Sequence, residues 1–514
     1  MLGNYCFQCI AKRICRVLIL VVLVLALKQS ANATTYYISL QGSDSNSGTQ
    51  GSPWVSLQHA IQVAGGGDTV LMRGGIYQTD EVWIRGDFGM GGSNGQYLTI
   101  RNYPGEVVSV GGTRRVIVDG APYVRIEGLH FRLPYNLTGG GQAFQVVNNT
   151  FQGPQPPYGA IEFFADSGLI EGNVIEITGG GNTQDHAIYL HAGHNNVIRD
   201  NVLSGQSGYG IHAYDAVASG GNEASHGYAN IVIEGNVVGN SQLRSGIIIA
   251  PDGIEARSVV VRKNIIANNA QGGLVLNYEK LRDIEVYNNV FYNNGEYGIG
   301  IYSSDIDSVE IINNAFSAHP SGDHIYNNSN ITHFTVTHNL YYQPQSVGFG
   351  TNDLHPVFGN PMFIDPAGLD FHLLPNSPAI DAGIFVGLPF VGAAPDLGAF
   401  EYAPPASISD PSSLKPQQFN LKQNYPNPFN PATSITYEIA ETTYVRINIF
   451  NMIGNEIKVL VDKTVSPGVY TVRWDGKDSL GENVATGVYF YRMKTFDAKL
   501  GVTFSDAKKL VLLR

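Results

Sequence analysis

A short β-rich phrase that ends in asparagine recurs along the middle of the chain, and this repeat limits the possible folds more than any other feature. One copy, Asp283 to Asn289, reads Asp-Ile-Glu-Val-Tyr-Asn-Asn. The related phrases end at Asn149, Asn173, Asn201, Asn236, Asn264, Asn314 and Asn339. Neighbouring copies lie 24 to 35 residues apart, and the last three intervals are each 25 residues. A repeat of this length is typical of a solenoid or a propeller.

Each phrase alternates apolar and polar residues, as a strand with one buried face does. Ile284 and Val286 point to one side, and Glu285 points to the other. A second strand signal precedes the phrases, as in 298–302, and a third follows them, as in 290–292. Three short strands in each turn of the repeat predict the coils of a three-sheet parallel β-helix, because a propeller blade needs about 40 residues. Abundant glycine and only 14% charged residues also favour strands and turns over amphipathic helices.

The recurrent asparagine is expected at a bend between two sheets. Asparagine tolerates the left-handed backbone that a sharp bend often needs. Stacked amide side chains can also donate hydrogen bonds from one coil to the next. Since a position buried between coils has no access to solute, we expect these asparagines to be structural and not ligands.

Segments at both ends of the repeat resemble right-handed parallel β-helix proteins of the polysaccharide-lyase type. The opening segment contains Gly42-Ser-Asp-Ser-Asn-Ser-Gly-Thr49 and Gly67-Asp-Thr-Val-Leu71. The closing segment contains Ser377-Pro-Ala-Ile-Asp-Ala-Gly383 and Asp396-Leu-Gly-Ala-Phe-Glu401. The resemblance implies a right-handed β-helix over residues 34–402, and right-handed crossovers are also the general rule for parallel strands. It says little about function, because the same end segments occur on lyases, hydrolases and uncharacterised surface proteins.

The first 33 residues read as a signal peptide. Basic residues precede an apolar run of 11 residues, Val17–Leu27, which is too short to span a bilayer as a helix. Ala31-Asn32-Ala33 fits the small-residue cleavage rule. We therefore expect cleavage after Ala33 and a protein outside the cell or on its outer surface. The alternative is an uncleaved membrane anchor.

The composition excludes several classes of function. The three cysteines Cys6, Cys9 and Cys15 precede the expected cut, so the mature protein would have neither disulfide nor thiolate chemistry. The chain has a formal net charge of −12, and loss of the four basic residues of the leader would make it −16. Such a surface repels nucleic acid. We expect a monomer that binds no nucleic acid.

A second domain follows a linker rich in proline and serine, residues 403–418. Regularly spaced alternating segments over residues 419–514 predict a small Ig-like β-sandwich. Three stretches, Tyr425-Pro-Asn-Pro-Phe-Asn-Pro431, Gly487-Val-Tyr-Phe-Tyr491 and Lys508-Lys-Leu-Val-Leu-Leu-Arg514, resemble the sorting domain of type IX secretion. The resemblance implies the type IX machinery as a partner, followed by release or attachment at the cell surface. The alternative is a plain stalk or a carbohydrate-binding sandwich.

The coils around Asn201, Asn236 and Asn264 are longer than the rest, and insertions in a solenoid often form the binding side. Alternation in residues 186–191 predicts His186 on the core face with Ile188. The same pattern predicts an outward aromatic shelf, consisting of Tyr189, His191, His212 and Tyr214. Aromatic faces with polar tips suit sugar rings. The alternative is a ladder of rings that only stiffens the sheet.

Two chemistries could operate beside this shelf. A lyase acting on uronic acid chains neutralises a carboxylate with Ca²⁺ or arginine and removes an adjacent proton with a base. A hydrolase needs two carboxylates across a sugar, and Asp215 with Asp252 or Glu223 could supply them. The candidate catalytic residues are Lys280, His212 and Asp215; the candidate substrate ligands are Tyr189, His191, Tyr214 and Arg257; and the candidate Ca²⁺ ligands are Asp252 and Glu255.

These observations predict a secreted or cell-surface protein with a polysaccharide as partner. A polysaccharide lyase is the favoured enzymatic interpretation, and a glycoside hydrolase is the second. A non-catalytic carbohydrate-binding or adhesive protein is the alternative from another class, and a purely structural solenoid is a third. Between Thr34 and Glu401 the chain has only two lysines, Lys263 and Lys280. This scarcity weakens the lyase interpretation and leaves neutral glycans open.

Overall fold

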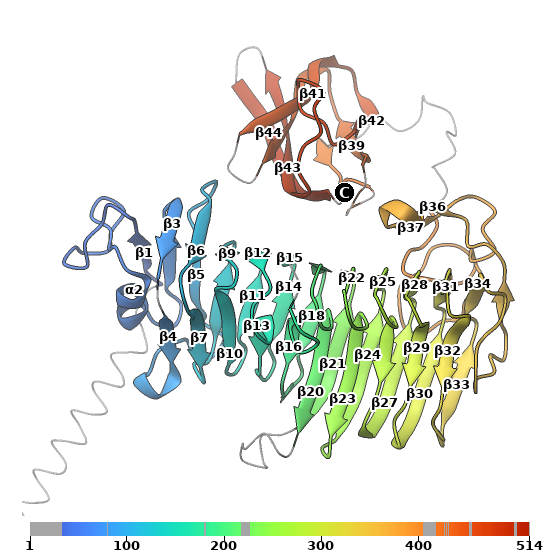
Figure 1. Ribbon diagram of the computed structural model, residues 1–514. Coiled ribbons are helices and arrows are strands. Elements are labelled where there is room, and N and C mark those ends of the chain that lie inside the picture. Colours follow the sequence, from blue (N-terminus) through green and yellow to red (C-terminus); the bar gives the residue numbers. More distant parts are fainter. Residues whose placement is uncertain are drawn as a thin grey trace, which may run out of the picture.

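The chain folds into a long solenoid of parallel strands and a smaller antiparallel sandwich (Figure 1). The computed structural model describes residues 33–79, 81–178, 181–216, 227–403, 418–425, 427, 429, 431–451, 455–497 and 501–512. The predicted fold class, an all-β protein with a three-sheet parallel β-helix followed by an Ig-like sandwich, is confirmed. The predicted signal peptide lies outside the described residues except for Ala33.

Three parallel sheets wrap the solenoid, and a complete coil contributes one strand to each sheet. The thirteen-stranded sheet contains β1 (Thr35–Ile38), β2 (Thr69–Met72), β5 (Leu98–Asn102), β8 (Val124–Glu127), β11 (Gln145–Val147), β14 (Leu169–Glu171), β17 (Gly193–His194), β18 (Val197–Arg199), β21 (Tyr228–Glu234), β24 (Ala256–Arg262), β27 (Glu279–Tyr287), β30 (Asp305–Ile312) and β33 (Phe334–Thr337). The twelve-stranded sheet contains β3 (Gly75–Gln78), β6 (Val108–Gly111), β9 (His130–Arg132), β12 (Thr150–Pro154), β15 (Val174–Thr178), β19 (Val202–Ser204), β22 (Val237–Gly239), β25 (Ile265–Ala267), β28 (Val290–Tyr292), β31 (Ala315–Ser317), β34 (Leu340–Tyr342) and β35 (Val357–Phe358). The ten-stranded sheet contains β4 (Val82–Arg85), β7 (Arg115–Asp119), β10 (Asn136–Gly140), β13 (Gly159–Phe163), β16 (His186–Leu190), β20 (Ile211–Ala216), β23 (Ile247–Asp252), β26 (Leu274–Leu276), β29 (Tyr297–Ile301) and β32 (Asp323–Asn327).

Register between coils keeps like residues in rows. Ile284 lies opposite Val259 in the preceding coil and Val309 in the following one. All three side chains are fully buried, so the predicted alternation of core and solvent faces is confirmed. Burial of one such side chain stabilises the fold by about 1.5–3 kcal/mol, and the row repeats this contribution in each coil.

The recurrent asparagines form a continuous ladder at the bend between the thirteen-stranded and twelve-stranded sheets. The backbone N–H and the Nδ2 of Asn264 both donate to Oδ1 of Asn289, each at 3.0 Å. The same pair of bonds links every step from Asn149 to Asn339. The ladder ends on the carboxylate of Asp353, which accepts from Asn339. The predicted coil-to-coil ladder of amides is confirmed.

The left-handed residue of each bend is the one before the ladder asparagine. Its φ is +54° at Asn148 and at Lys263 and +65° at Gly172, whereas the ladder asparagines have no positive φ. The prediction that the recurrent asparagine itself takes the left-handed conformation is therefore wrong. The chain turns one residue earlier, which leaves the asparagine immediately before the next strand. Its buried amide can there bond to both neighbouring coils.

Both ends of the solenoid carry non-repeating segments. At the start, α2 (Leu57–Val63), capped by the Ser56 hydroxyl, packs Leu57 and Ile61 into the core. A short 3₁₀ helix, η2 (Gly86–Phe88), follows β4. At the other end, β36 (Phe363–Asp365), η5 (Pro366–Gly368) and β37 (Asp370–Leu373) form an antiparallel flap. This flap and the segment after it pack onto outward apolar residues of the twelve-stranded sheet, such as Val290 and Leu340.

The C-terminal sandwich consists of two antiparallel sheets. The first contains β38 (Asn420–Leu421), β39 (Thr433–Ile439) and β42 (Gly468–Trp474), and the second contains β41 (Glu456–Val465), β40 (Thr443–Asn451), β43 (Gly487–Asp497) and β44 (Gly501–Leu512). Trp474 and Tyr491 are fully buried between the sheets. The predicted linker, 403–418, lies outside the described residues apart from its two ends.

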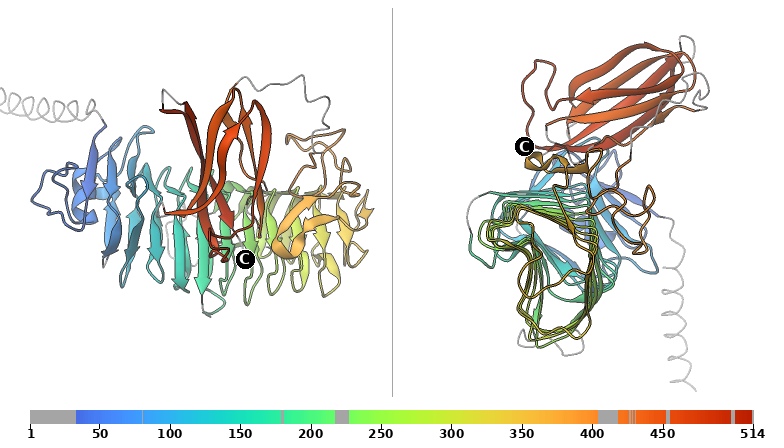
Figure 2. Two further views of the ribbon diagram at one scale, coloured as in Figure 1. Left: turned by 90° about the horizontal axis from the view of Figure 1, so that it is seen from above. Right: turned by 90° about the vertical axis from the view of Figure 1, so that its right-hand side faces the viewer.

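The sandwich rests against the side of the solenoid (Figure 2). Val511 of β44 belongs to one buried apolar cluster with Val202 and Val237 of the twelve-stranded sheet. Nearby, the Nζ of Lys509 donates to Oδ1 of Asn148 at 3.2 Å. The last strand of the chain therefore makes both an apolar and a polar contact with the solenoid.

Candidate functional site

The outer face of the ten-stranded sheet carries a row of polar and aromatic side chains in register. Glu162 of β13 lies opposite Tyr189 of β16, which lies opposite His212 of β20. The rings of Tyr189 and His212 are stacked, with centroids 4.9 Å apart and planes 6° from parallel. Strand register thus places one side chain from each of three successive coils on one line, and the line runs along the solenoid axis.

Of the other two residues of the aromatic shelf, His191 directly follows β16 and Tyr214 lies in β20. His191 is 3.7 Å from Tyr189 between ring centroids, and Tyr214 is 5.3 Å from His212. Phe164, an exposed residue one coil earlier, extends the surface beyond His191 at 5.9 Å. The structure brings together the four rings that the sequence groups, although their role as substrate ligands stays a prediction.

His186 lies beside the shelf and not in the core. Its side chain is buried, and its ring centroid is 4.3 Å from that of His212 and 5.3 Å from that of Tyr189. The prediction that His186 shares the core face with Ile188 is wrong, because His186 is the first residue of β16, at a bend where the strand alternation does not yet hold. At this position the two imidazole nitrogens also have hydrogen-bond partners, which an apolar core would not provide.

Hydrogen bonds tie His186 to two neighbours. Its Nδ1 accepts the backbone N–H of Tyr209 at 3.0 Å, and its Nε2 lies 2.8 Å from Nδ1 of His212. Gly208 permits this approach, since a Cβ at that position would collide with Nδ1 of His186. The guanidinium of Arg244 lies over the ring of Tyr209 at 5.9 Å.

Burial keeps the histidines of this face uncharged. Desolvation lowers the pKa of His186 to about 3 and the pKa of His191 to about 4, with the neighbouring Asp215 opposing the second shift. It also holds the pKa of His212 well below its ordinary value. Burial raises the pKa of Tyr189 above its ordinary value. At neutral pH the aromatic shelf is therefore a surface of uncharged rings with hydrogen-bonding edges.

Glu162 is a site residue that the sequence reasoning missed. The residue is only 7% exposed, and its carboxylate accepts from Nδ2 of Asn136 at 3.1 Å and lies 3.5 Å from Arg115. Burial raises the pKa of Glu162, and the charge of Arg115 opposes that shift. A cavity of about 530 Å³ beside it is also lined by Tyr158 and Arg114. The detectable signal was a single charged residue inside the apolar phrase 159–163, one coil before Tyr189.

The remaining candidate catalytic residues are held by other groups. The Nζ of Lys280 donates to the carbonyl oxygen of Gly253 at 2.7 Å. Asp215 is buried, and its carboxylate accepts the backbone N–H of Gly227 at 2.8 Å. Asp215 therefore joins the two ends of the insertion between β20 and β21. Catalytic roles for Lys280, His212 and Asp215 stay predictions.

The candidate Ca²⁺ ligands near the insertion each bond to a candidate substrate ligand. Asp252 accepts the hydroxyl of Tyr214 at 3.1 Å, and Glu255 pairs with Arg257 at 2.6 Å. Within the described ranges, no group of three or more His, Cys, Asp or Glu side chains could hold a metal ion. Asp252 and Glu255 alone do not supply the six to eight oxygen ligands that Ca²⁺ takes. Glu223 lies outside the described residues.

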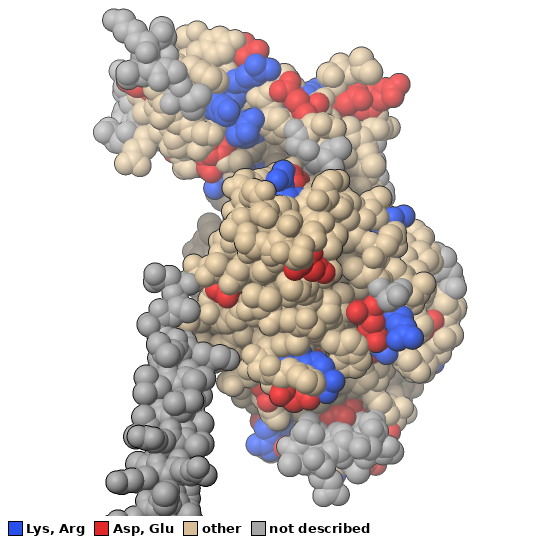
Figure 3. Space-filling model, turned by 90° about the vertical axis from the view of Figure 1, so that its left-hand side faces the viewer, with Lys and Arg blue, Asp and Glu red and all other residues tan. Residues whose placement is uncertain are grey.

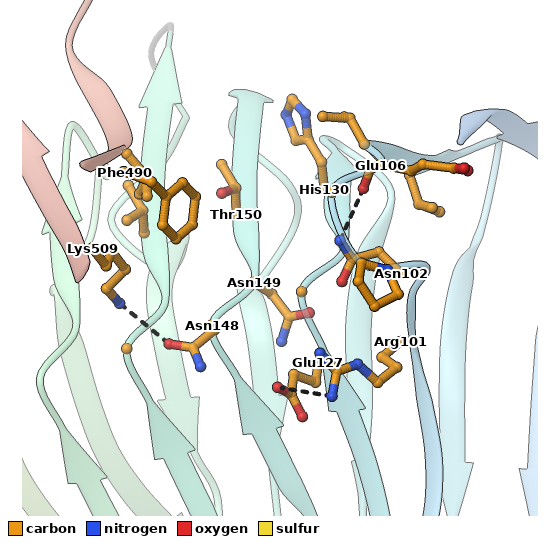
Figure 4. A pocket seen from close by; sticks show the side chains of 18 residues that line it. Arg101, Asn102, Glu106, Glu127, His130, Asn148, Asn149, Thr150, Phe490 and Lys509 are labelled. Atoms are coloured by element: carbon orange, nitrogen blue, oxygen red, sulfur yellow. Dashed lines mark hydrogen bonds and ion pairs between the residues drawn. The ribbon is translucent and has the colours of Figure 1, made fainter. Parts of the chain in front are cut away.

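A second cavity, of about 540 Å³, lies between the solenoid and the sandwich (Figure 4). Glu127, His130 and Asn148 line it from the solenoid, and Phe490 and Lys509 line it from the sandwich. Burial lowers the pKa of Lys509, and the carboxylates of Asp200 and Glu171 oppose this shift. This cavity belongs to the contact between the domains and lies on a different sheet from the shelf.

The solenoid surface carries few charges, as its N-terminal end shows (Figure 3). Acidic and basic side chains on it often pair, as in Arg73 with Glu106 and Arg125 with Glu127. In the described part of the chain, no helix is long and apolar enough to cross a membrane.

Comparisons with known proteins identify the two folds. Residues 184–340 match the family model described as a right handed beta helix region, which confirms the predicted handedness. Residues 430–499 match the FlgD Ig-like domain. The uncharacterized protein YwoF of Bacillus subtilis is 35% identical over 95 residues, which are 18% of this chain and 19% of that protein, so the match spans about a fifth of the relative.

Several solved structures are similar at low sequence identity. Pectate lyase Pel9A is 13% identical, with 73% of this chain and 98% of that chain covered and a TM-score of 0.49. The complex of XylC with xylose is 12% identical, with 92% and 100% covered and a TM-score of 0.45. A rhamnogalacturonan lyase is 14% identical, with 67% and 94% covered and a TM-score of 0.39.

Proposed function

We propose that this protein is a carbohydrate-active β-helix protein that binds a polysaccharide along the outer face of its ten-stranded sheet. The observation that carries the proposal is the parallel stack of Tyr189 on His212, flanked by His191 and Tyr214. Tyr189 and His212 cover one another's facing sides, so their polar edges can bond to sugar hydroxyl groups, and only ring faces outside the stack can cover the apolar faces of sugar rings. Neighbouring coils lie about 4.8 Å apart, so the stacked rings offer a linear series of contacts to an extended chain.

A second candidate function is cleavage of the bound chain. Glu162 favours it, because a buried carboxyl with a raised pKa one coil from Tyr189 can hold the proton that a leaving glycosidic oxygen needs. A lyase is the alternative form of cleavage. Its predicted base, Lys280, is engaged with the Gly253 carbonyl, which disfavours the lyase.

A glycan screen tests both functions. The secreted form would be run in affinity electrophoresis against alginate, pectate, chondroitin and neutral glycans. Products would be followed by the absorbance of unsaturated sugars for a lyase and by new reducing ends for either enzyme. We expect at least one glycan to retard the unmodified protein. Tyr189→Ala and Tyr214→Ala should weaken this retardation, and Tyr444→Ala, an exposed variant in the sandwich, should not. Equal retardation of all four proteins, or none at all, would overturn the proposal.

We also propose that the protein acts outside the cell or on its outer surface, after export by the type IX machinery. The support is the leader-like segment 1–33 together with the motifs of residues 425–431 and 508–514. Fusion of residues 419–514 to a periplasmic reporter, in a host with this machinery, tests the idea. Retention of the reporter inside the cell would argue against it.

A further inference from the structure

Two hydrogen bonds determine which nitrogen of His212 carries its proton. The backbone N–H of Tyr209 can only donate, so Nδ1 of His186 accepts and is unprotonated. The proton of the neutral His186 ring is then on Nε2. Because Nε2 of His186 and Nδ1 of His212 are 2.8 Å apart, Nε2 donates and Nδ1 of His212 accepts. His212 must therefore carry its own proton on Nε2.

This assignment has no alternative that keeps both bonds. The reverse direction would require His186 to accept at both nitrogens, which a neutral imidazole cannot do. Protonation of His212 on both nitrogens would break the bond, and burial disfavours it by lowering the pKa of His212. The Nε2–H of His212 finds no acceptor among the residues that the structure describes, and the residue as a whole keeps 7% exposure.

We infer that His186 is a positioning residue that holds His212 as a fixed Nε2–H donor to an acceptor oxygen of an uncharged glycan. The inference rests on the proposed function and specifies its substrate class. A fixed donor bonds to a hydroxyl, ring or glycosidic oxygen, and it repels the ammonium group of an amino sugar.

The charges near the shelf favour a neutral chain over an acidic one. Three of the nearby cations are engaged by polar groups: Arg115 lies 3.5 Å from Glu162, Arg257 pairs with Glu255, and Lys280 bonds to the Gly253 carbonyl. The fourth, Arg244, lies over the ring of Tyr209, close enough to His186 and His212 to help lower their pKa values. The three histidines of this face are uncharged at neutral pH. A polyanionic chain would thus meet one cation beside the shelf, Arg244, together with the acidic side chains of Glu162 and Asp215, whereas sugar hydroxyls meet uncharged donors.

Imidazole ¹⁵N NMR tests the hydrogen-bond chain without any glycan. The secreted form should show His212 with a bare Nδ1 and a protonated Nε2 across neutral pH. His186→Phe keeps a ring of similar size but removes the donor, so His212 should change to a mixture of tautomers. His186→Gln restores an N–H donor and should keep the wild-type tautomer. An Nδ1-protonated His212 in the unmodified protein would overturn the assignment even if a variant failed to fold.

Binding measurements test the substrate class. Xylan and mixed-linkage glucan serve as neutral chains, pectate as the acidic chain and chitosan as the cationic chain. We expect the neutral chains to bind more tightly than pectate or chitosan. His186→Phe should raise the Kd for the neutral chains about two- to tenfold, the effect of one lost hydrogen bond, and His186→Gln should largely restore it.

The outcomes separate this inference from the proposed function. Preferential binding of pectate through the shelf would overturn the substrate class and leave glycan binding intact. Unchanged binding by His186→Phe, with a changed tautomer, would show that the His212 proton does not reach the ligand. Absence of binding to any glycan would refute the proposed function, while the NMR result would still decide the tautomer.

Discussion

The ring of Tyr189 lies parallel to the ring of His212, with 4.9 Å between centroids, although 23 residues separate them in the chain. The pairing of β16 with β20 creates this contact, since Tyr189 and His212 are partners in the parallel register. A stack between coils is therefore part of the sheet itself, and a ligand need not reorder the two rings to use them. This preformed surface lowers the entropic cost of binding.

The contribution of Tyr189 can be divided by two substitutions. Tyr189→Phe keeps the stack on His212 and removes only the hydroxyl, so it should weaken glycan binding less than Tyr189→Ala. Loss of the ring should cost about 0.5–1.5 kcal/mol, which is about a two- to tenfold rise in Kd. Calorimetric titration measures the difference. Equal effects of Phe and Ala would mean that the hydroxyl and not the ring face contacts the sugar.

Glu162→Gln tests cleavage. If Glu162 supplies the proton to the leaving oxygen, the rate should fall by about 10²–10⁴. In the unmodified protein the rate should fall as the pH rises through the raised pKa of Glu162. Glu162 resists ionisation in the folded state, so Glu162→Gln should not lower the melting temperature at neutral pH.

Glu176→Gln is the matched control, because burial also raises the pKa of Glu176 but it lies in the twelve-stranded sheet. Equal loss of activity in both variants would contradict the role.

Stability should fall in acid because buried histidines are held neutral. The pKa of His186 is lowered to about 3, as is the pKa of His319, whereas an unfolded histidine titrates near 6.5. Below pH 6.5 these histidines bind protons in the unfolded chain but stay unprotonated in the folded chain. Stability present above that pH is therefore lost as the pH falls toward 3, by about 1.4 kcal/mol per pH unit for each such histidine. Denaturant unfolding across this window measures the slope, and His319→Gln should reduce it. A flat profile between pH 6.5 and 4 would be inconsistent with buried neutral histidines.

The asparagine ladder should be sensitive to a single deletion. Oδ1 of Asn264 accepts from both the N–H and the Nδ2 of Asn236, and its Nδ2 donates to the carbonyls of Ile233 and Arg262. Asn264→Ala leaves these buried groups without partners, at about 1–3 kcal/mol for each unsatisfied group. We expect a clear loss of unfolding free energy, in contrast to the exposed Asn420→Ala in the sandwich. A cost no larger than that of Asn420→Ala would mean that water replaces the amide.

Periodicity was enough to predict the solenoid, because the repeat fixes both the coil length and the alternation of each strand. Tyr189 and His212 could be grouped for the same reason. The alternation within each strand and the order of the coils place both residues on the outer face of one sheet. The left-handed residue of each bend was assigned one position too late, to the ladder asparagine instead of its predecessor. Sequence letters alone do not separate two adjacent residues that both suit a bend, as Asn288 and Asn289 illustrate.

Predictions failed where contacts depend on strand ends and loops. The alternation in β16 places His186 on the core face with Ile188. In the structure His186 lies at a bend, and its ring is bonded to His212 on the outer face. Glu162 was missed because a single glutamate in an apolar phrase matches no sequence motif. Only the strand register shows that it lies opposite Tyr189 in the next coil. Lys280 was selected from two lysines because it lies in the inserted region, and the sequence could not show that its Nζ bonds to the Gly253 carbonyl; its catalytic role stays a prediction.

Lys509 should control how firmly the sandwich rests on the solenoid. Its Nζ donates to Asn148 and lies near the charges of Asp200 and Glu171, and burial lowers its pKa. Lys509→Met keeps the stem against the solenoid but removes the charge, so the two domains should separate more readily. Hydrogen exchange of β44, together with small-angle scattering, should report the change. Lys508→Met is the matched control, because Lys508 is half-exposed and pairs with Asp506 inside the sandwich. Equal exchange in both variants would show that Val511 and its apolar neighbours hold the contact without the lysine.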